Sequence, residues 1–262
     1  MIITNKKQQG RDLMNNYKDY ERPSVAADIV TFGIDSERAV NKRELDSKML
    51  KILLIKRGEE PFKGQYSLPG GFLRPTETIE EAALRELKEE TGIKTATLIP
   101  LKTYSAPDRD PRGWIISCAF AALIPTIETY TDAESDAESS FWVSIEMGTD
   151  EINIANGEII ITIENEKAYC DKLAFDHAQI IYDAYLKLKD EVVNHDIIFD
   201  LLPEYFTIAD LKIPYEMITG KKEAAANFRR KISKKIEETD MFDNGGAMHR
   251  PSKLYKRSSE QE

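Results

Sequence analysis

The stretch from Gly71 to Ile93 constrains the fold more than any other part of this 262-residue chain. Thr78 and Glu81 have the spacing of a capping box that begins a helix, and Gly92 can end a helix in the left-handed conformation. The sequence therefore predicts a helix from about Ile79 to Thr91. Its apolar residues recur every four positions and would pack on a sheet. These residues are Ile79, Ala83 and Leu87.

Three glutamates of the predicted helix, Glu86, Glu89 and Glu90, lie within one turn. Like charges at this spacing destabilise a helix unless a cation lies among them. Carboxylate oxygens suit Mg²⁺ or Mn²⁺, and bound Mg²⁺ commonly also contacts substrate phosphates. The pattern indicates a divalent-cation site, and a solvated acidic helix face is the alternative.

The chain resembles the Nudix hydrolases, because the same stretch fills all nine defined positions of their signature box. The matching residues are Gly71, Glu77, Arg85, Glu86, Leu87, Glu89, Glu90, Gly92 and Ile93. The resemblance implies an α/β fold, the Nudix α/β/α sandwich with a mixed sheet. It also implies metal-assisted attack of water on the phosphorus of a nucleoside diphosphate linked to another group.

The same resemblance implies a role for each box residue. Glu86, Glu89 and Glu90 would bind Mg²⁺ or Mn²⁺, and the carbonyl of Gly71 would be a further ligand. Glu77 would pair with Arg85 to brace the loop against the helix, so Glu77, Arg85 and Glu89 are candidate catalytic residues. Nudix enzymes often take a general base from an acidic loop outside the box, and we expect Glu138 there, with Glu134 as the alternative.

Overall composition narrows the class of protein. The net charge of −10 argues against a protein that coats nucleic acid with its whole surface. With Cys118 and Cys170 as the two cysteines, we expect no disulfide framework and no cysteine-rich zinc site. The first 22 residues are polar, and no apolar run approaches the roughly 18 residues of a membrane span. We expect a soluble, cytoplasmic protein without membrane contact.

Alternating apolar runs, rich in β-branched and aromatic residues, predict strands outside the box. These runs are Ser24–Phe32, Met49–Lys56, Leu98–Ser105, Trp114–Ile124 and Phe141–Ile145. The charged residues from Asp35 to Lys48 predict a surface loop. Asn156 and Gly157 predict a type I′ hairpin turn. A helical pattern begins at Leu173 and includes His177, which we expect to be a structural residue.

The loop from Pro107 to Gly113 carries two arginines, Arg109 and Arg112, between proline and glycine. A guanidinium group matches phosphate in a bidentate way, so the loop could hold phosphate or ribose oxygens, with a solvated charged turn as the alternative. Its Asp-Pro-Arg-Gly sequence resembles the loop of ADP-ribose-recognising Nudix proteins and their regulator relatives. The substrate-binding candidates are Arg57, Arg109, Asp110 and Arg112.

The charge balance reverses near the C-terminus, where residues 219–257 hold 11 Lys or Arg against 5 Asp or Glu. Thr207 and Asp210 predict the start of a short helix, Pro214 the start of the next, and residues 223–239 a basic helix with Phe228, Ile232 and Ile236 inside. A Gly-Gly hairpin follows, as in a winged helix-turn-helix. The candidate DNA contacts are Asn227, Arg229, Arg230, Lys231, Lys234, Lys235 and Arg250. The alternative is a solvated face of a docking or dimerisation module.

Three C-terminal segments resemble Nudix-related transcriptional regulators, which control NAD metabolism or sugar use in bacteria. They are Leu201–Thr207, Asn227–Ile232 and His249–Pro251. Many such regulators have lost catalytic residues and sense ADP-ribose or a related effector, whereas this chain keeps every box position. The resemblance also implies a homodimer.

We expect a polar segment over residues 1–21, a Nudix domain over 22–190 and a winged helix-turn-helix domain over 195–258. The intact box makes magnesium-dependent hydrolysis of an ADP-ribose-like nucleotide the first functional hypothesis. The alternative is a DNA-binding regulator of transcription whose Nudix domain senses such a nucleotide as an effector.

Overall fold

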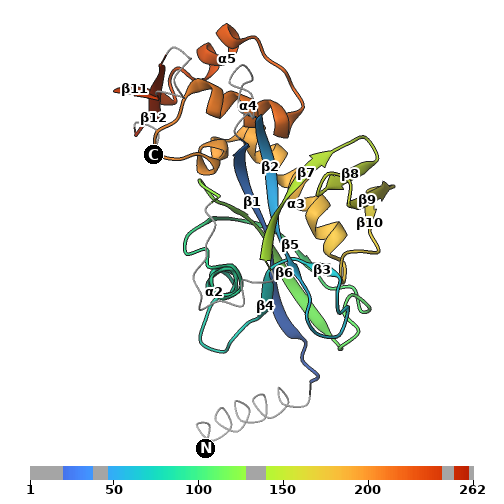
Figure 1. Ribbon diagram of the computed structural model, residues 1–262. Helices are drawn as coiled ribbons and strands as arrows, with labels where there is room; N and C mark the ends of the chain where they lie inside the picture. The colour runs from blue at the N-terminus through green and yellow to red at the C-terminus, as the bar shows by residue number, and fades with distance from the viewer. Residues whose placement is uncertain (1–19, 38–46, 128–139, 244–250, 260–262) are drawn as a thin grey trace, which may run out of the picture.

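The computed structural model describes residues 20–37, 47–127, 140–243 and 251–259. A ten-stranded mixed sheet forms the frame of the larger domain (Figure 1), in the order β10-β9-β8-β7-β2-β1-β6-β5, with β3 paired to β2 and β4 to β1. The strands are β1 (Ser24–Glu37), β2 (Ser47–Lys56), β3 (Tyr66–Ser67), β4 (Gly70–Phe72), β5 (Thr97–Tyr104), β6 (Ile115–Leu123), β7 (Ser140–Met147), β8 (Glu151–Ile154), β9 (Ile159–Glu164) and β10 (Lys167–Tyr169). Only the β1–β6 pair is parallel among the strand pairs of the described residues.

Two helices lie on opposite sides of the central strands β1 and β2 (Figure 1), which confirms the predicted sandwich. Helix α2 (Ile79–Thr91) has the predicted bounds, the Thr78–Glu81 capping box and a left-handed Gly92 with φ of 77°. Ala83 and Leu87 of α2 are buried against residues of β1 and β6, as the apolar stripe predicts. Helix α3 (His177–Asn194) covers the other face and begins four residues after Leu173, where the helical pattern starts.

The predicted surface loop between β1 and β2 needs correction. β1 continues to Glu37 and β2 begins at Ser47, so both ends of the expected surface loop are paired strand, because Glu37 lies opposite Ser47 in the ladder. Residues 38–46 lie outside the described residues. The predicted turn between β8 and β9 is present: Asn156 and Gly157 both have positive φ, at 56° and 87°, and the Glu158 amide donates to the Ala155 carbonyl at 3.1 Å. Ala155 also has positive φ, at 54°, and the Gly157 amide donates to the Ile154 carbonyl at 3.2 Å, so a second turn overlaps the predicted one.

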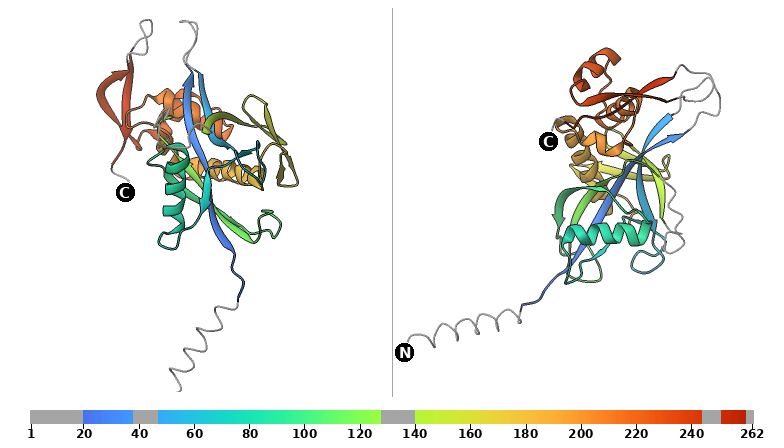
Figure 2. Two further views of the ribbon diagram at one scale, coloured as in Figure 1. Left: turned by 60° about the horizontal axis from the view of Figure 1, so that its bottom comes forward. Right: turned by 90° about the vertical axis from the view of Figure 1, so that its left-hand side faces the viewer.

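The C-terminal domain lies at one end of the sandwich in Figure 1 and in the right-hand view of Figure 2. It consists of a 3-10 helix η2 (Ile197–Leu201), helices α4 (Ile208–Thr219) and α5 (Ala225–Ile232), and the antiparallel strands β11 (Ile236–Asp243) and β12 (Ser252–Arg257). Two helices followed by a paired hairpin confirm the predicted winged-helix class.

Two details of this domain differ from prediction. The basic helix ends at Ile232 rather than at residue 239, because Ile236 pairs with Arg257 and begins a strand. Pro214 lies inside α4 instead of starting a new helix. A proline removes one helix hydrogen bond, and α4 tolerates that loss because Leu211 and Ile218 are anchored in the core on either side of it.

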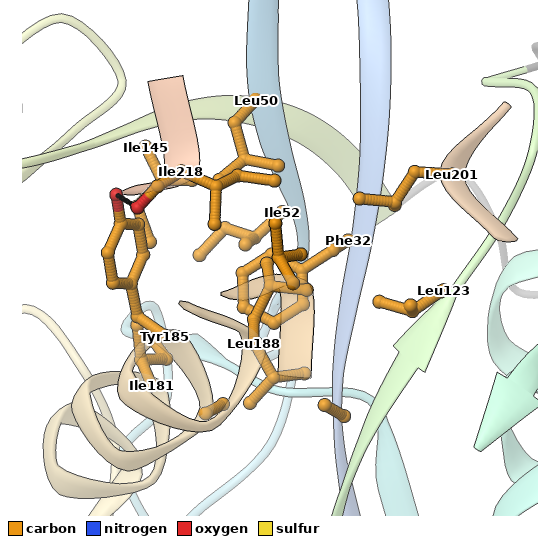
Figure 3. Close-up of a cluster of buried hydrophobic side chains, with 14 of the residues drawn as sticks. Phe32, Leu50, Ile52, Leu123, Ile145, Ile181, Tyr185, Leu188, Leu201 and Ile218 are labelled. Atoms are coloured by element: carbon orange, nitrogen blue, oxygen red, sulfur yellow. Dashed lines mark hydrogen bonds between the residues drawn. The ribbon is translucent and has the colours of Figure 1, made fainter. Parts of the chain in front are cut away.

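The two domains share one apolar core. Figure 3 shows Tyr185 and Leu188 of α3 beside Ile218 of α4, with Leu50 and Ile52 of β2 in the same cluster. The ion pair between Lys48 of β2 and Asp210 of α4, with N···O at 2.7 Å, ties the same two parts. Because apolar packing is continuous, the winged helix is seated on the Nudix domain. Among the described residues no helix is long and apolar enough to cross a membrane.

Candidate functional site

A pocket lies between β1, β4, the arginine loop and the start of α3. It is lined by Ala26, Asp28, Arg57, Leu68, Gly70, Gly71, Phe72, Arg109, Asp110, Arg112, Ile115, Phe175 and His177. The structure therefore gathers all four predicted substrate-binding residues in one place. Asp28, Phe72 and Phe175 were not predicted to belong to the site, and they reach it from well-separated parts of the chain.

The floor of the pocket is a buried polar network around Asp28 of β1. The Ser117 hydroxyl donates to Asp28 Oδ2 at 2.5 Å, and Arg109 Nη2 donates to the same oxygen at 3.1 Å. Arg109 also binds Asp176 through Nε and Nη2, at 3.0 and 2.7 Å. Its guanidinium is thus engaged by two carboxylates, so Arg109 braces the pocket wall rather than presenting a free cation.

His177 completes this floor. Its Nδ1 accepts a hydrogen bond from the Leu68 amide at 2.9 Å, which leaves Nε2 as the ring nitrogen that carries a proton. Nε2 lies 3.6 Å from Asp28 Oδ1. This arrangement fits the structural role predicted for His177, although the ring also faces the pocket.

Acid is expected to destabilise the protein as Asp28 is protonated. Burial raises the pKa of Asp28, but His177, Ser117 and Arg109 together outweigh burial and hold this pKa at about 2, below the ordinary 3.8. Because the folded-state pKa is the lower one, the network contributes about 2 kcal/mol above pH 4, and this is lost as the pH falls through about 2. Urea unfolding between pH 2 and 6 measures this loss as a fall in the free energy of unfolding. The free energy of unfolding of Asp28→Asn should depend less on pH than that of wild type. An equal pH dependence in wild type and Asp28→Asn would contradict this role of Asp28.

The outer wall of the pocket is a stack of arginines and aromatic rings. The Arg112 guanidinium carbon lies 5.3 Å from the centroid of Phe72 and 5.2 Å from that of Phe175, and Arg57 lies 4.9 Å from Phe175. Asp110 fixes Arg112 by accepting from Nε at 3.0 Å and Nη2 at 2.7 Å. Asp110 is buried, so its role is to orient Arg112.

Arg57 differs from the other two arginines in its partners. Its Nε donates to the Pro61 carbonyl at 2.8 Å, and no carboxylate among the described residues forms an ion pair with it. Burial, followed by the neighbouring positive charge of Arg112, lowers the pKa of Arg57. Arg57 is therefore a partly desolvated cation on which the charges of Asp110, Glu90 and Glu59 act without a direct ion pair, and an anionic ligand would supply a direct partner.

The box residues lie beside this pocket. Arg85 binds both carboxylate oxygens of Glu77, at 2.8 and 2.7 Å, which confirms the predicted brace. Arg85 also donates to the Phe72 carbonyl at 3.1 Å, to Glu86 at 2.5 Å and to Glu89 at 3.1 Å. The helix is thus tied to the β4 segment that forms the pocket edge.

Glu86 and Glu90 lie against the Gly70–Gly71 backbone. A Cβ at Gly71 would lie 2.4 Å from the carboxyl carbon of Glu86, so a side chain there would force the Glu86 carboxylate to move. The Gly70 amide donates to Glu90 Oε2 at 2.8 Å. Burial, with the nearby charges of Glu86 and Asp28, raises the pKa of Glu90 to about 7. A partly buried acidic pair of this kind, beside the Gly70–Gly71 backbone, fits a hard divalent cation.

The third predicted ligand is oriented differently. Glu89 is half-exposed and turned towards Arg74 and Arg85, at 3.2 and 3.1 Å. No group of three or more His, Cys, Asp or Glu residues is arranged as a metal site within the described part of the chain. Metal binding by Glu89 would require its side chain to leave these two arginines. Glu134 and Glu138, the candidate general bases, lie outside the described residues.

The winged helix divides the predicted DNA contacts into two sets. Asn227, Arg229, Arg230 and Lys234 are exposed. Lys231 instead lies 4.2 Å from the Tyr215 ring centroid and pairs with Glu223 at 3.2 Å, while Lys235 pairs with Asp196. Lys231 and Lys235 are thus engaged within the protein. Arg250 lies outside the described residues.

The described strands of the wing carry balanced charge. Lys253 pairs with Glu238 at 2.6 Å, Lys256 with Glu237 at 3.0 Å, and Arg257 with Asp200 of η2 at 3.2 Å. The wing strands therefore offer fewer free cations than the sequence predicts. The exposed basic surface of this domain is concentrated on α5 and the two residues that follow it.

Comparison with known proteins covers both domains. Residues 39–161 match the NUDIX domain family, and residues 198–256 match the NrtR DNA-binding winged helix domain family. The ADPR responsive transcriptional repressor NtrR of Acinetobacter baylyi is 30% identical over 242 residues, which are 91% of this chain and 83% of that protein. The ADP-ribose pyrophosphatase of Methanocaldococcus jannaschii is 38% identical over 180 residues, 69% of this chain and 82% of that protein.

Several solved structures resemble nearly the whole chain, among them a MutT/nudix family protein from Enterococcus faecalis, with a TM-score of 0.72 and 26% sequence identity over 95% of this chain and 93% of that one. Shewanella oneidensis NrtR complexed with a 27mer DNA has a TM-score of 0.61 and 25% sequence identity to this protein. The similarity covers 89% of this chain and 93% of that one. The likeness therefore extends over the larger domain and the winged helix together.

Proposed function

We propose that this protein is a DNA-binding regulator whose pocket senses ADP-ribose or a close relative. The chain belongs to the Nudix family and carries an NrtR-type winged-helix domain. The observation that carries this proposal is the exposed basic surface of α5 on a domain that shares its core with the Nudix fold. Sequence alone ranked hydrolysis first, and the full-length similarity to a repressor reverses that order.

The surface of α5 suits double-stranded DNA. Arginine and asparagine side chains read guanine and adenine in the major groove, and lysine adds phosphate contacts. Arg230 and Asn227 lie one turn apart, and Arg230 Nη2 donates to Asn227 Oδ1 at 3.2 Å, which places both groups on one side of the helix. We infer that Asn227, Arg229, Arg230 and Lys234 contact DNA. Lys231 is exposed and pairs with Glu223, and Lys235 pairs with Asp196, so DNA contact by these two lysines stays a prediction.

The pocket suits a nucleotide with a pyrophosphate group. Arg57 offers a positive charge without a direct ion-pair partner, and the exposed ring of Phe72 offers flat apolar surface for a base. Asp28 and the His177 ring at the floor can meet ribose hydroxyl or amino groups by hydrogen bonding. ADP-ribose combines these features, and two similar proteins carry that ligand in their names.

The experiment that tests the function selects DNA from a random-sequence pool with the purified protein. The affinity for the selected DNA is then measured with and without ADP-ribose. We expect a salt-dependent, sequence-selective complex whose dissociation constant changes at least about fivefold with saturating ADP-ribose. AMP and ribose 5-phosphate serve as control ligands. Weak, sequence-independent binding that ignores ADP-ribose would refute the proposal.

Removal of the unpaired pocket cation is expected to weaken nucleotide binding. Arg57→Ala should raise the dissociation constant for ADP-ribose about tenfold or more, since a charge-assisted contact to phosphate contributes about 1.5–3 kcal/mol. Calorimetric titration measures the effect. Lys56→Ala is the matched control, because Lys56 precedes Arg57 but is exposed outside the pocket. Equal affinities of Arg57→Ala and wild type would remove Arg57 from the site.

Hydrolysis is the second candidate function, and the intact box favours it. The Glu77–Arg85 brace is formed, and Glu86 and Glu90 are held beside Gly70–Gly71. Bound Mg²⁺ or Mn²⁺ would neutralise pyrophosphate charge and activate water. Release of AMP from ADP-ribose, sensitive to a chelator, tests this candidate. Slow turnover and effector sensing are compatible in one chain.

A further inference from the structure

Helix α3 begins at the pocket. Phe175, Asp176 and His177 are consecutive, and each has a part in the site. The guanidinium carbons of Arg57 and Arg112 lie 4.9 and 5.2 Å from the centroid of the Phe175 ring, Asp176 accepts two hydrogen bonds from Arg109, and His177 lines the pocket. A ligand that contacts the stack therefore acts directly on the first turn of α3.

The other end of α3 is seated on the winged helix. The helix has 18 residues and is thus about 27 Å long. Leu188 and Val192 are buried in the core shared with Phe199 of η2 and Phe228 of α5. Figure 3 shows the Tyr185 hydroxyl directed at the Ile218 carbonyl of α4, at 3.5 Å.

The link continues past the end of the helix. Asp196, two residues beyond α3, forms an ion pair with Lys235, which lies three residues beyond the basic helix α5. The contacts are therefore continuous from the pocket to the DNA-binding surface. They run along α3, through Asp196 just after it, to Lys235 just after α5.

A small cavity lies at this joint. It has a volume of about 40 Å³ and is bordered by α3, η2, α4 and α5 through residues that include Val192, Phe199, Tyr215 and Phe228. Close-packed interiors transmit displacements, and helix shifts of about 1–2 Å at interfaces are a common switching motion. This small, partly open pocket leaves the end of α3 incompletely packed against the winged helix.

We propose that α3 is the element that transmits the ligand state of the pocket to the DNA-binding surface. Ligand that displaces Phe175 or the Arg109–Asp176 bridge shifts α3 along the sheet, and the shift repositions α4 and α5 through Leu188, Val192 and Asp196. The inference rests on the proposed function, since it requires a ligand and a DNA site on the same chain.

The test lowers the helical stability of the middle of α3 and leaves the residues at both of its ends unchanged. Leu186 and Lys189 are exposed, lie midway along the helix, and contact neither the pocket nor the winged-helix joint. The double variant Leu186→Gly/Lys189→Gly weakens the helix locally, and Leu186→Ala/Lys189→Ala is the matched control that keeps it stiff. For each protein, DNA affinity is measured with and without ADP-ribose, together with ADP-ribose affinity alone.

We expect ADP-ribose to change DNA affinity at least about fivefold in wild type and in the alanine pair, and less than about twofold in the glycine pair. ADP-ribose affinity should stay within about twofold of wild type in all three. Equal coupling in the glycine and alanine pairs would overturn the role of α3 and leave the proposed function standing. Absence of coupling in wild type would overturn the proposed function itself.

A second variant tests the far end of the link and remains decisive if the glycine pair folds poorly. Asp196→Asn removes the ion pair with Lys235. Asp190→Asn removes the same charge from an exposed position of α3, where the carboxylate accepts a hydrogen bond from the nearby Asn194 side chain. The factor by which ADP-ribose changes the DNA affinity should fall at least about twofold in Asp196→Asn and stay unchanged in Asp190→Asn. An equal factor in the two variants would count against the link from α3 to α5.

Discussion

Replacing Arg230 and Lys234 together by alanine is expected to weaken binding of the selected DNA about 100-fold and to leave ADP-ribose binding unchanged. Both residues are exposed at the basic surface, and α5 is held in place instead by the buried side chains of Phe228 and Ile232. A base contact by arginine contributes about 1–3 kcal/mol, and each lost phosphate contact lowers the salt slope by about one. Dissociation constants at several salt concentrations therefore separate the two roles.

The matched control for this experiment removes the same charge from the wing. In Lys253→Ala/Lys256→Ala the deleted lysines are paired with Glu238 and Glu237, so we expect DNA affinity to change less than about fivefold. Equal losses in the two double variants would indicate general electrostatic attraction instead of recognition by α5. Such a result would favour the alternative that the basic helix is a solvated face of a docking module.

Local signals were sufficient where the structure depends on neighbours in sequence. The capping box at Thr78, the apolar stripe through Leu87 and the left-handed Gly92 are all properties of one short stretch, and α2 has the predicted bounds. The Glu77–Arg85 pair belongs to the same stretch. Propensity and spacing therefore determine this part without knowledge of the rest of the chain.

Prediction failed where distant partners decide the structure. Phe228, Ile232 and Ile236 are spaced for one continuous helix, yet pairing with Arg257 makes Ile236 a strand residue. Lys235 follows the same basic pattern as Lys234 and is engaged by Asp196, which is 39 residues away in sequence. No local signal distinguishes the two lysines.

The pocket, too, depends on contacts between residues far apart in sequence, which local signals do not reveal. Asp28 and Arg109 are 81 residues apart, and Leu68 and His177 are 109 residues apart. The sequence identified the arginine loop, but it could not show that Arg109 is bound by two carboxylates while Arg57 has none. That difference decides which arginine is available to a phosphate, and it follows only from the arrangement of β1, the loop and α3.

Replacing Glu90 by glutamine is expected to separate catalysis from stability. If the chain hydrolyses ADP-ribose, Glu90→Gln should lower turnover at least about 100-fold, because losing a metal-binding charge removes about 3 kcal/mol of transition-state stabilisation. The fold should persist, since the glutamine oxygen can still accept the hydrogen bond from the Gly70 amide. Release of AMP with Mg²⁺ or Mn²⁺ measures the first effect.

The same substitution should stabilise the metal-free protein at alkaline pH. The pKa of Glu90 is raised from 4.5 to about 7, so its contribution to stability is present below pH 4.5 and is lost as the pH rises through 7. Glutamine avoids this loss, and the free energy of unfolding at pH 8 should rise by up to about 3 kcal/mol. Glu80→Gln, at an exposed position of α2, is the control and should change neither property.

The two readouts together distinguish a functional carboxylate from a merely solvated one. A carboxylate that binds a metal or ligand can destabilise the free protein, because its charge is partly desolvated there. Removing such a carboxylate raises stability and lowers activity, whereas removing a solvated one changes neither. Unchanged turnover in Glu90→Gln would refute the metal assignment. If wild type lacks turnover, stabilisation by Mn²⁺ in wild type and its loss in Glu90→Gln would still identify Glu90 as a metal ligand of a sensing pocket, whereas equal stabilisation in both would exclude it.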